Sequence, residues 1–555
     1  MTTDQSTTLS LLFPPDAPAA TTTRSGIPNE DDLGLHMIVT MIDPDGQHQR
    51  FIADTLSHLI YDPHTIRYRQ AIFADLQRLP QLVEQLLALL PHLRDLTDSG
   101  GSLLWHSDTP LLQVASRLAE LDNYVRCVEE LSSALDDAGD ALSAEGLLAL
   151  RTSLNTLRAE PDYVQLAQEL PELRSRMNEA SSITIGVNLD PQLNPESATI
   201  VSINTTRFAG KGTLLDRLLG DHAAQETTRG VSSLYKANEN QPHTPEHDLF
   251  RDMRRLLERI AAPVAKVLDR YRRIRLGPLA TIEPELAFYL GAVKLANELQ
   301  DAGLPLCQPK IAPADERTCV IEDTYNIDLV LRMRHLHDTE LTKTVVTNDV
   351  TFDQHATIAL LTGPNSGGKT TYTRAVGQAH ILFQAGLPIP GRQARISPVD
   401  GIYTHFATAE RLDIGRGRLA EELERIATIF ASASRHSLIL INEPFTSTDY
   451  NAARVLGRDL VAGLQMLGAR TLLVTHLHDL VHDALALNNG TTHAGITSLV
   501  AGATITDDDS EGLQPTYHVT HGQPQNVGYA TELAHRYGLS REQIARTLRE
   551  RGLTD

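Results

Sequence analysis

Short apolar runs and longer helical patterns follow one another in the C-terminal half of the chain. Three runs have the length of a fully buried strand and end in polar residues, at 357–361, 438–441 and 471–474. Continuous apolar strands of this kind are typical of a parallel sheet that is covered on both faces. Residues 371–384 follow the first run with the pattern of a helix. The pattern therefore predicts an α/β domain.

The N-terminal half has a different texture. Apolar residues recur at helical spacing within residues 32–98, 111–135, 142–157 and 283–302. Between the third and fourth of these stretches, residues 183–189 and 198–203 read as two strands, and the Asp-Pro and Asn-Pro pairs between them are turn signals. This half is therefore predicted to be mainly helical with a small β-rich insertion.

These patterns divide the chain into three parts. Residues 1–30 are rich in Thr, Pro, Ser and Asp and are expected to be a mobile, disordered segment. Residues 31–310 form the helical part, with the β-rich insertion at about 180–240, and residues 311–555 form the α/β part with a helical C-terminal tail. A length of 555 residues allows three or four domains of about 150 residues each.

A phosphate-binding loop follows the first apolar run. It fits the pattern of a glycine, four further residues and then Gly-Lys-Thr, between a strand and a helix. Such a loop turns its backbone N–H groups and a helix N-terminus toward phosphates, while its Lys reaches the outer phosphates and its hydroxyl holds Mg²⁺. The alternative, a glycine-rich turn that matches by chance, is disfavoured by the flanking elements. We therefore expect ATP and Mg²⁺ to bind here, at Gly363, Pro364, Asn365, Ser366, Gly367, Gly368, Lys369, Thr370 and Thr371.

Polar residues at the ends of the other two runs supply candidate catalytic groups. Glu443 is placed to polarise the attacking water, and Asn442 before it stands where an aspartate would help Thr370 to hold Mg²⁺. Because an amide brings no charge to the cation, we expect weaker Mg²⁺ binding or slow turnover. His476 follows the third run and is expected in the crevice where such sheets bind ligands, sensing the γ-phosphate or orienting the water. A purely structural histidine is the alternative.

These motifs, in this order, resemble the ATPase domain of the MutS family, which belongs to the wider ABC-type ATPases. The resemblance extends from Asn348 to a tail at 529–551 and includes the phosphate loop, Asn442-Glu443 and Thr475-His476. It implies a P-loop ATPase domain of the ABC and MutS type, preceded by a helical core or lever domain whose β-rich insertion is clamp-like. Segment 57–70 also resembles the opening of that core domain, though less closely. The segment before the helical part is expected to be too short to form the family's mismatch-reading domain. No endonuclease domain is expected after the ATPase part.

The resemblance is incomplete at one functional segment. In MutS proteins, a Ser- and Thr-rich signature reaches the nucleotide of the partner subunit. The matching segment here is 414–419, with Gly417 and Arg418 in place of Ser and Thr. Arg416 or Arg418 could supply a positive charge in trans, as an arginine finger does; the alternative is a solvated basic turn. The loop from Glu443 to Asp449 is also partly similar to that of transporter-type ABC ATPases, so the chain is predicted to be a divergent relative.

Composition and charge set limits on partners and compartment. The formal net charge of −21 argues against nonspecific binding of polyanions by the chain as a whole. Segment 251–275 is nevertheless rich in arginine and could follow DNA phosphates, or be a solvated face paired with acidic helices. No apolar stretch approaches a membrane span, and the three cysteines show no pairing or metal-ligand spacing. A reduced, cytoplasmic compartment is expected.

The expected function is that of an ATP-dependent DNA-binding protein of the MutS type. It would act as a homodimeric clamp that couples ATP binding and hydrolysis to recognition of mismatched or branched DNA by shape, in repair or recombination control. One alternative is a nucleotide-gated switch that recruits a protein partner. Another is an ABC-type ATPase coupled to something other than DNA.

Overall fold

The structure is a computed structural model, and the described residues group into two compact units. Unit 1 contains residues 1–87, 138–149 and 284–555, and unit 2 contains residues 88–137 and 150–283. The boundaries of these units differ from the domain boundaries predicted from the sequence, which lie at residues 30 and 310. The difference arises because the first helices pack with the elements of the C-terminal α/β part. The described residues are 9–17, 30–99, 110–178, 182–189, 195–204, 261–273, 277–335, 341–406, 417–488, 495–505, 513–523 and 537–553.

A six-stranded sheet lies at the centre of unit 1, with the strand order β10-β11-β12-β7-β13-β14. The first five strands run parallel, and β14 is antiparallel to β13. Every residue of β7, β11 and β12 is buried, as their continuous apolar sequence predicts. The strands are β7 (Ile358–Thr362), β10 (Ile402–His405), β11 (Leu438–Asn442), β12 (Arg470–Val474), β13 (Ile496–Ile505) and β14 (Leu513–His521).

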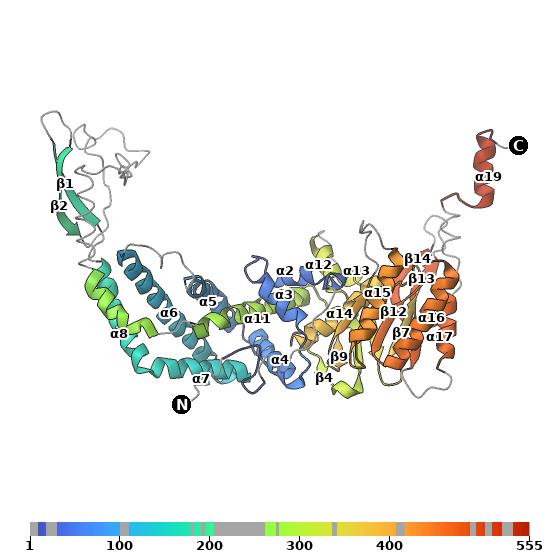
Figure 1. The fold of residues 1–555 in the computed structure, drawn as a ribbon, viewed down its shortest axis with the longest axis horizontal. Helices are drawn as coiled ribbons and strands as arrows, with labels where there is room; N and C mark the ends of the chain where they lie inside the picture. Colours follow the sequence, from blue (N-terminus) through green and yellow to red (C-terminus); the bar gives the residue numbers. More distant parts are fainter. Residues whose placement is uncertain are drawn as a thin grey trace. The chain divides into compact units, whose positions relative to one another are not determined.

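Helices cover both faces of this sheet (Figure 1). One face of β11 places Ile439 and Ile441 in a core cluster with residues from three helices, including Ile426 and Leu460. On the other face, α14 passes so close that a Cβ on Gly377 would lie 3.0 Å from Cδ1 of Leu440. The helices are α14 (Lys369–Gln384) on one face and α15 (Arg418–Ser432), α16 (Tyr450–Leu467) and α17 (His478–Ala486) on the other.

Local sequence signals fix where these helices begin and end. The side chain of Asp449 accepts hydrogen bonds from the N–H groups of Asn451 and Ala452, which start α16. The same helix ends at Gly468, whose φ of 72° favours glycine. In the N-terminal part, Asp62 caps a helix that opens with Pro63 in the same way.

The described residues of unit 1 contain further helices and two smaller sheets. Helix α14 contacts η1, α3 and α12. A second sheet has the strand order β4-β9-β5-β6, and β3 pairs with β8. The helical elements are η1 (Glu30–Leu33), α2 (Leu35–Ile42), α3 (Gln49–Ser57), α4 (Pro63–Arg78), η3 (Gly139–Ala141), η5 (Ala314–Glu316), α12 (Ile327–His335), α13 (Leu341–Thr344) and α19 (Arg541–Glu550). The strands are β3 (Leu306–Cys307), β4 (Lys310–Ile311), β5 (Cys319–Thr324), β6 (Asn348–Phe352), β8 (Ile389–Pro390) and β9 (Gln393–Ile396).

The expectation of a mobile N-terminal segment is wrong for residues 9–17. Leu11 is fully buried, and its carbonyl accepts a hydrogen bond from the Tyr289 hydroxyl at 2.9 Å. The buried Arg69 guanidinium donates through Nε to the carbonyl of Leu12 at 2.8 Å, and Ser10 donates to Glu285 at 2.7 Å. A short apolar run within a Thr- and Pro-rich segment is thus enough to anchor it. Residues 1–8 and 18–29 lie outside the described residues.

Within its described ranges, unit 2 is helical with one strand pair. Tyr163 packs edge-on against Tyr124 with ring centroids 6.2 Å apart, and its hydroxyl donates to Glu129 at 2.9 Å. The two predicted strands are present and pair antiparallel; whether they act as a clamp stays a prediction. Elements that lie wholly or partly in this unit are α5 (Pro80–Ser99), α6 (Pro110–Ala138), α7 (Glu145–Ala159), α8 (Pro161–Asn178), β1 (Ser182–Leu189), β2 (Pro195–Asn204), η4 (Asp269–Arg273) and α11 (Gly277–Asp301).

No helix in the described ranges is both long and apolar enough to cross a membrane. The cysteines Cys127, Cys307 and Cys319 are all free thiols. Burial raises the pKa of the Cys127 and Cys319 thiols to about 12 in each case.

Candidate functional site

The predicted site residues meet at one edge of the central sheet. Strands β7, β12 and β11 are neighbours, and because they run parallel their carboxyl ends lie together. Two backbone hydrogen bonds hold these ends in register: Thr475 N–H donates to Leu361 at 3.0 Å, and Glu443 N–H donates to Val474 at 2.9 Å. The phosphate loop, Glu443 and His476 follow these three strands directly.

The phosphate loop depends on two glycines with positive φ. Gly363 has a φ of 137°, and Gly368, immediately before α14, has a φ of 79°. A Cβ on Gly363 would lie 2.8 Å from both Cβ and the carbonyl oxygen of Ala501 on β13. A larger residue would therefore be strained at Gly363 and would displace β13, which makes this loop different from an ordinary glycine-rich turn.

Lys369 is the first residue of α14 and is almost completely buried. Its ammonium donates to the carbonyl oxygens of Gly363 at 2.9 Å and Pro364 at 2.8 Å. Burial lowers the pKa of Lys369, and the nearby Glu443 carboxylate opposes this shift. An ammonium has three donors, so Lys369 can keep its place in the loop and also meet a phosphate oxygen.

Thr370 and Asn442 come together as candidate magnesium ligands. The Thr370 hydroxyl lies 3.4 Å from Oδ1 of Asn442, across the gap between α14 and β11. A hydroxyl and an amide oxygen at this spacing fit a hard cation that keeps several of its waters. Glu443 is the adjacent carboxylate, so Thr370 and Asn442 fit Mg²⁺ with the negative charge of Glu443 next to them in the chain.

Glu443 and His476 form a direct pair. Nε2 of His476 lies 2.7 Å from Oε1 of Glu443, and both side chains are about one-third exposed. The hydrogen bond from His476 lowers the pKa of Glu443, burial opposes this, and the charges of His476 and Lys369 add to the lowering. Glu443 therefore stays ionised, which suits a group that accepts a proton from water.

The backbone around Glu443 is strained and held from a neighbouring helix. Glu443 has a φ of 53° and Phe445 a φ of 62°, which non-glycine residues rarely adopt. The N–H of Phe445 donates to Oε2 of Glu422 on α15 at 2.9 Å, and the Phe445 ring is buried in the core cluster. Helix α15 thus fixes the loop that carries the candidate catalytic carboxylate.

The segment that resembles the family signature is described only in part. Gly417 is the N-cap of α15, and Arg418 begins that helix. Nε of Arg418 lies 3.6 Å from Oε1 of Glu422, while the Arg418 side chain is about half exposed. Arg418 is therefore paired within its own helix. This pairing favours neither a charge supplied in trans nor a solvated basic turn. Arg416 lies outside the described residues.

Sequence reasoning missed a cavity of about 450 Å³ beside the phosphate loop. Tyr517 of β14 lines it with a φ of 58°, and Asn348 fixes that backbone by donating to the Tyr517 carbonyl at 3.0 Å and accepting from Val519 N–H at 2.6 Å. The antiparallel strand β14 carries no pattern that would have indicated this position. The described lining also includes Tyr325, Asn326, Leu329, Met333, Thr344, Val346, Asn365, Thr371 and Tyr372.

The basic segment 251–275 is described only at residues 261–273. Lys266 is exposed on the helix formed by residues 261–268. Nη1 of Arg270 lies 3.4 Å from Glu169 of α8, which fits a solvated face paired with an acidic helix. The other arginines of the segment, apart from Arg272 and Arg273 in η4, lie outside the described residues.

Comparison with known proteins identifies the part of the chain that contains this site as a domain of a known family. The family model described as MutS domain V matches residues 359–547, so this part of the chain is an ATPase domain of the MutS type. A second model, the MutS2 N-terminal domain, matches residues 61–302. With both matches in the same chain and in this order, the protein belongs to the MutS family.

Curated relatives carry the description "Endonuclease MutS2". Those of Streptococcus pneumoniae strains Taiwan19F-14, Hungary19A-6 and CGSP14 are each 27% identical to this chain over 292 residues. The match covers 52% of this chain and 35% of each relative. The chain thus matches about a third of the length of these relatives, and the word endonuclease describes the relatives as whole proteins.

Proposed function

We propose that the chain binds and hydrolyses ATP at the edge of the central sheet and uses the cycle to control binding of DNA. The observation that carries this proposal is the meeting of the phosphate loop, Thr370 with Asn442, and Glu443 with His476 at one set of strand ends. In this arrangement the residues that bind phosphates lie beside a carboxylate that can accept a proton. The MutS-type ATPase domain supports the assignment.

Each group has a distinct role in the proposed reaction. The loop N–H groups and Lys369 hold the phosphates, and the cavity beside Tyr517 accepts the base. Glu443 accepts a proton from water, and His476 orients the carboxylate through its Nε2–H. When bound between Thr370 and Asn442, Mg²⁺ would supply charge neutralisation at the phosphates.

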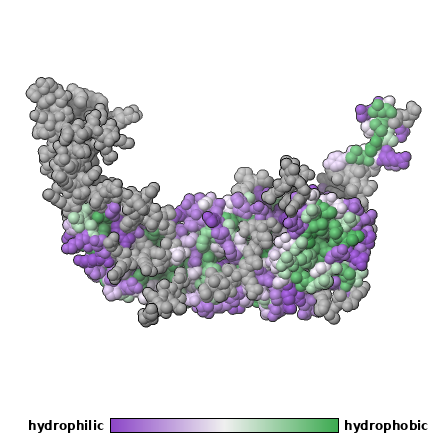
Figure 2. All heavy atoms as spheres, viewed as in Figure 1, coloured by the Kyte–Doolittle hydropathy of each residue, from purple (hydrophilic) through white to green (hydrophobic). Residues whose placement is uncertain are grey.

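The proposed assembly is a homodimer in which each subunit completes the site of the other. In this assembly, Arg418 at the start of α15 would reach the site of the partner subunit. The support for the assembly is α19, which buries none of its residues; Ile544 of this helix and the flanking Leu539 and Leu553 are exposed. Figure 2 shows hydrophobic residues along this helix. Exposed apolar side chains on an amphipathic helix favour an interface.

The DNA role is tested by binding of the purified protein to a matched duplex, a single-mismatch duplex and a four-way junction. Each is measured with and without ATP at two salt concentrations, because phosphate contacts weaken as salt rises. We expect preference for the junction, changed by ATP, since the chain is proposed to recognise shape. A preference for the mismatched duplex would mean that another surface of the protein recognises the mispaired base. No binding to any of the three at low salt would exclude DNA as the partner.

A second candidate function is a nucleotide-gated switch that recruits a protein partner. The neutral Asn442 at the magnesium position favours it, because weak charge neutralisation would slow hydrolysis and prolong the ATP-bound state. The two functions predict different results in the DNA experiment above: the switch predicts no ATP-dependent DNA binding, although ATP is bound.

A further inference from the structure

Asp32 of η1 contacts three elements of the ATPase part at once. Its backbone carbonyl accepts a hydrogen bond from Nε of Arg374 on α14 at 2.8 Å. Its carboxylate accepts from the Thr404 hydroxyl on β10 at 2.6 Å and lies 3.6 Å from Nη2 of Arg425 on α15. The Asp32 side chain is only 12% exposed. The backbone of Asp32 thus holds α14 while its partly buried carboxylate holds β10 and α15, so this one residue links α14 to α15.

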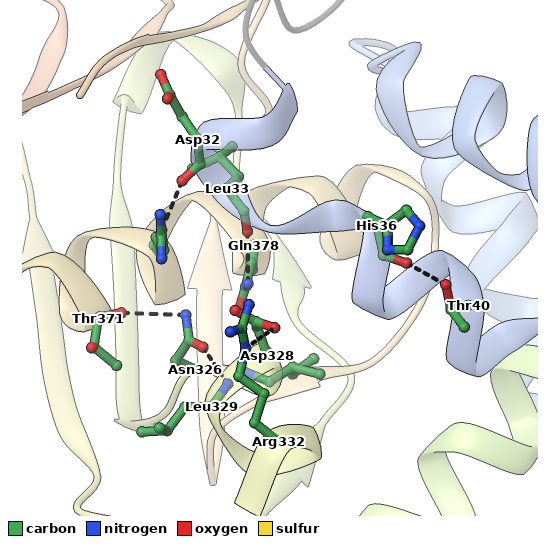
Figure 3. Close-up of polar contacts among 12 residues, drawn as sticks. Asp32, Leu33, His36, Thr40, Asn326, Asp328, Leu329, Arg332, Thr371 and Gln378 are labelled. Carbon is green, nitrogen blue, oxygen red and sulfur yellow. Dashed lines mark hydrogen bonds and ion pairs between the residues drawn. The ribbon is translucent and has the colours of Figure 1, made fainter. Parts of the chain in front are cut away.

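The next residue of η1 strengthens the contact with α14. The carbonyl of Leu33 accepts from Nε2 of Gln378 at 2.8 Å, and Oε1 of Gln378 accepts from the N–H of Ile327 at 3.2 Å. The Leu33 side chain is fully buried, and a Cβ on Gly377 would lie 2.7 Å from it. Figure 3 shows Asp32 and Leu33 of η1 with their carbonyl oxygens directed toward α14, and Gln378 between η1 and α12.

A second contact reaches the first turn of α14. Nδ2 of Asn326, immediately before α12, donates to the carbonyl of Thr371 at 3.4 Å, and its Oδ1 accepts from the N–H of Leu329 at 2.7 Å (Figure 3). Thr371 closes the phosphate loop. Helix α14 is therefore held near its start by Asn326 and further along by Asp32 and Leu33.

Helix α15, which Asp32 contacts through Arg425, also contacts the loop that carries Glu443. Arg425 lies three residues, or roughly one helical turn, after Glu422 on α15. Glu422 accepts the hydrogen bond from Phe445 N–H, two residues after Glu443. Helix α15 therefore links the two ends: its Arg425 contacts Asp32, and its Glu422 holds the strained loop that carries the catalytic carboxylate.

We propose that Asp32 is a positioning residue for ATP hydrolysis, which sets α15 and the Glu443 loop against the phosphate-binding helix. The inference rests on the proposed function, since it concerns the same site. Asp32 lies outside both segments matched by the family models, 61–302 and 359–547. Its role would be to place Glu443 for attack without contacting the nucleotide, so its loss should lower kcat and leave the KM for ATP nearly unchanged.

The test compares Asp32→Asn with Asp31→Asn in the full chain. Asp31 is the matched control because it is the neighbouring carboxylate and is exposed. We expect kcat to fall about tenfold in Asp32→Asn with KM changed less than about twofold, and neither to change in Asp31→Asn. A rise in KM with kcat unchanged would overturn the proposal, as would equal effects of the two variants.

A double-mutant cycle with Glu422→Ala tests the proposed route. If Asp32 acts through α15, the double variant should lose about as much kcat as the stronger single variant, and not the product of the two losses. Multiplicative losses would show that Asp32 and Glu422 act separately and would contradict the proposal.

Hydrogen exchange separates this inference from the proposed ATPase activity. Asp32→Asn should speed amide exchange in residues 443–448 relative to the wild type, and Asp31→Asn should not. If the wild-type protein hydrolyses no ATP but this exchange difference is present, the proposed function fails and the positional contact stands. If the wild type is active and neither exchange nor kcat responds to Asp32→Asn, the positioning role is wrong.

Discussion

His476 donates a hydrogen bond from Nε2 to the Glu443 carboxylate over 2.7 Å, joining the ends of β12 and β11. A carboxylate can only accept, so this contact requires a proton on Nε2 of His476. In this hydrogen bond His476 is therefore the donor and Glu443 the acceptor. Glu443 is held ionised by a neighbour on the next strand, at the edge of the sheet where Lys369 and the phosphate loop also lie.

Removal of His476 should change the pH dependence of hydrolysis. The hydrogen bond from His476 is the largest cause that lowers the pKa of Glu443. In His476→Ala this pKa should rise, so a larger fraction of Glu443 would be protonated in mildly acidic solution. The acidic limb of the profile of kcat against pH should move to higher pH, and kcat at neutral pH should fall by about tenfold or more. An acidic limb at the same pH would mean that Glu443 is not the titrating base.

Asn442→Asp should strengthen binding of Mg²⁺. The Asn442 amide lies 3.4 Å from the Thr370 hydroxyl, and a carboxylate in its place would add a negative charge beside the cation. We expect the Mg²⁺ concentration for half-maximal ATPase activity to fall about tenfold or more, with faster turnover. Asp449→Asn, which alters an exposed helix cap on the same loop, is a control for general effects on the loop. An unchanged Mg²⁺ dependence would place the metal elsewhere.

Tyr517 should matter for nucleotide affinity and not for chemistry. Its ring lines the cavity beside the phosphate loop, close to Gly368. Tyr517→Ala should raise the KM for ATP about tenfold through lost stacking, while Tyr517→Phe should retain the wild-type KM. Equal KM values for the wild type and Tyr517→Ala would mean that the base does not occupy this cavity.

The sequence alone predicted the strands and loops on which the site is built. Runs such as 438–441 are apolar on both faces, so their burial and the polar residue that follows are both visible in the sequence. The contacts of Tyr517 and Asp32 could not be predicted in this way. Tyr517 stands on an antiparallel edge strand, and Asp32 is separated from Arg425 on α15 by more than two thirds of the chain, so neither contact leaves a local pattern.

The N-terminal segment is a second case in which the sequence did not predict the structure. Its composition predicted mobility, but three side chains of unit 1 bind the backbone of residues 10–12: Tyr68, Arg69 and Tyr289. Composition averages over the segment, whereas anchoring needs only a few apolar residues and a matching set of donors. The Glu285 carboxylate adds an acceptor for the Ser10 hydroxyl and the Leu11 N–H, and its burial raises its pKa.

Asp32 should make folding stability depend on pH in a specific direction. Burial raises its pKa above the ordinary value of 3.8, while Thr404, Arg425 and Arg374 oppose the shift and Asp31 adds to it. A raised pKa contributes stability below the ordinary value that is lost as pH rises through the folded-state value. The melting temperature of Asp32→Asn relative to wild type should therefore increase from acidic to neutral pH. A relative melting temperature that decreases over this range would contradict the burial of the charge.

Steady-state ATP hydrolysis by Glu443→Gln, with nucleotide binding measured on the same sample, tests the central claim most directly. The amide keeps the shape of the side chain but cannot accept a proton from water. We predict that kcat falls by about a hundredfold or more while ATP affinity stays close to that of the wild type. Hydrolysis at the wild-type rate in Glu443→Gln would contradict the assignment of this site.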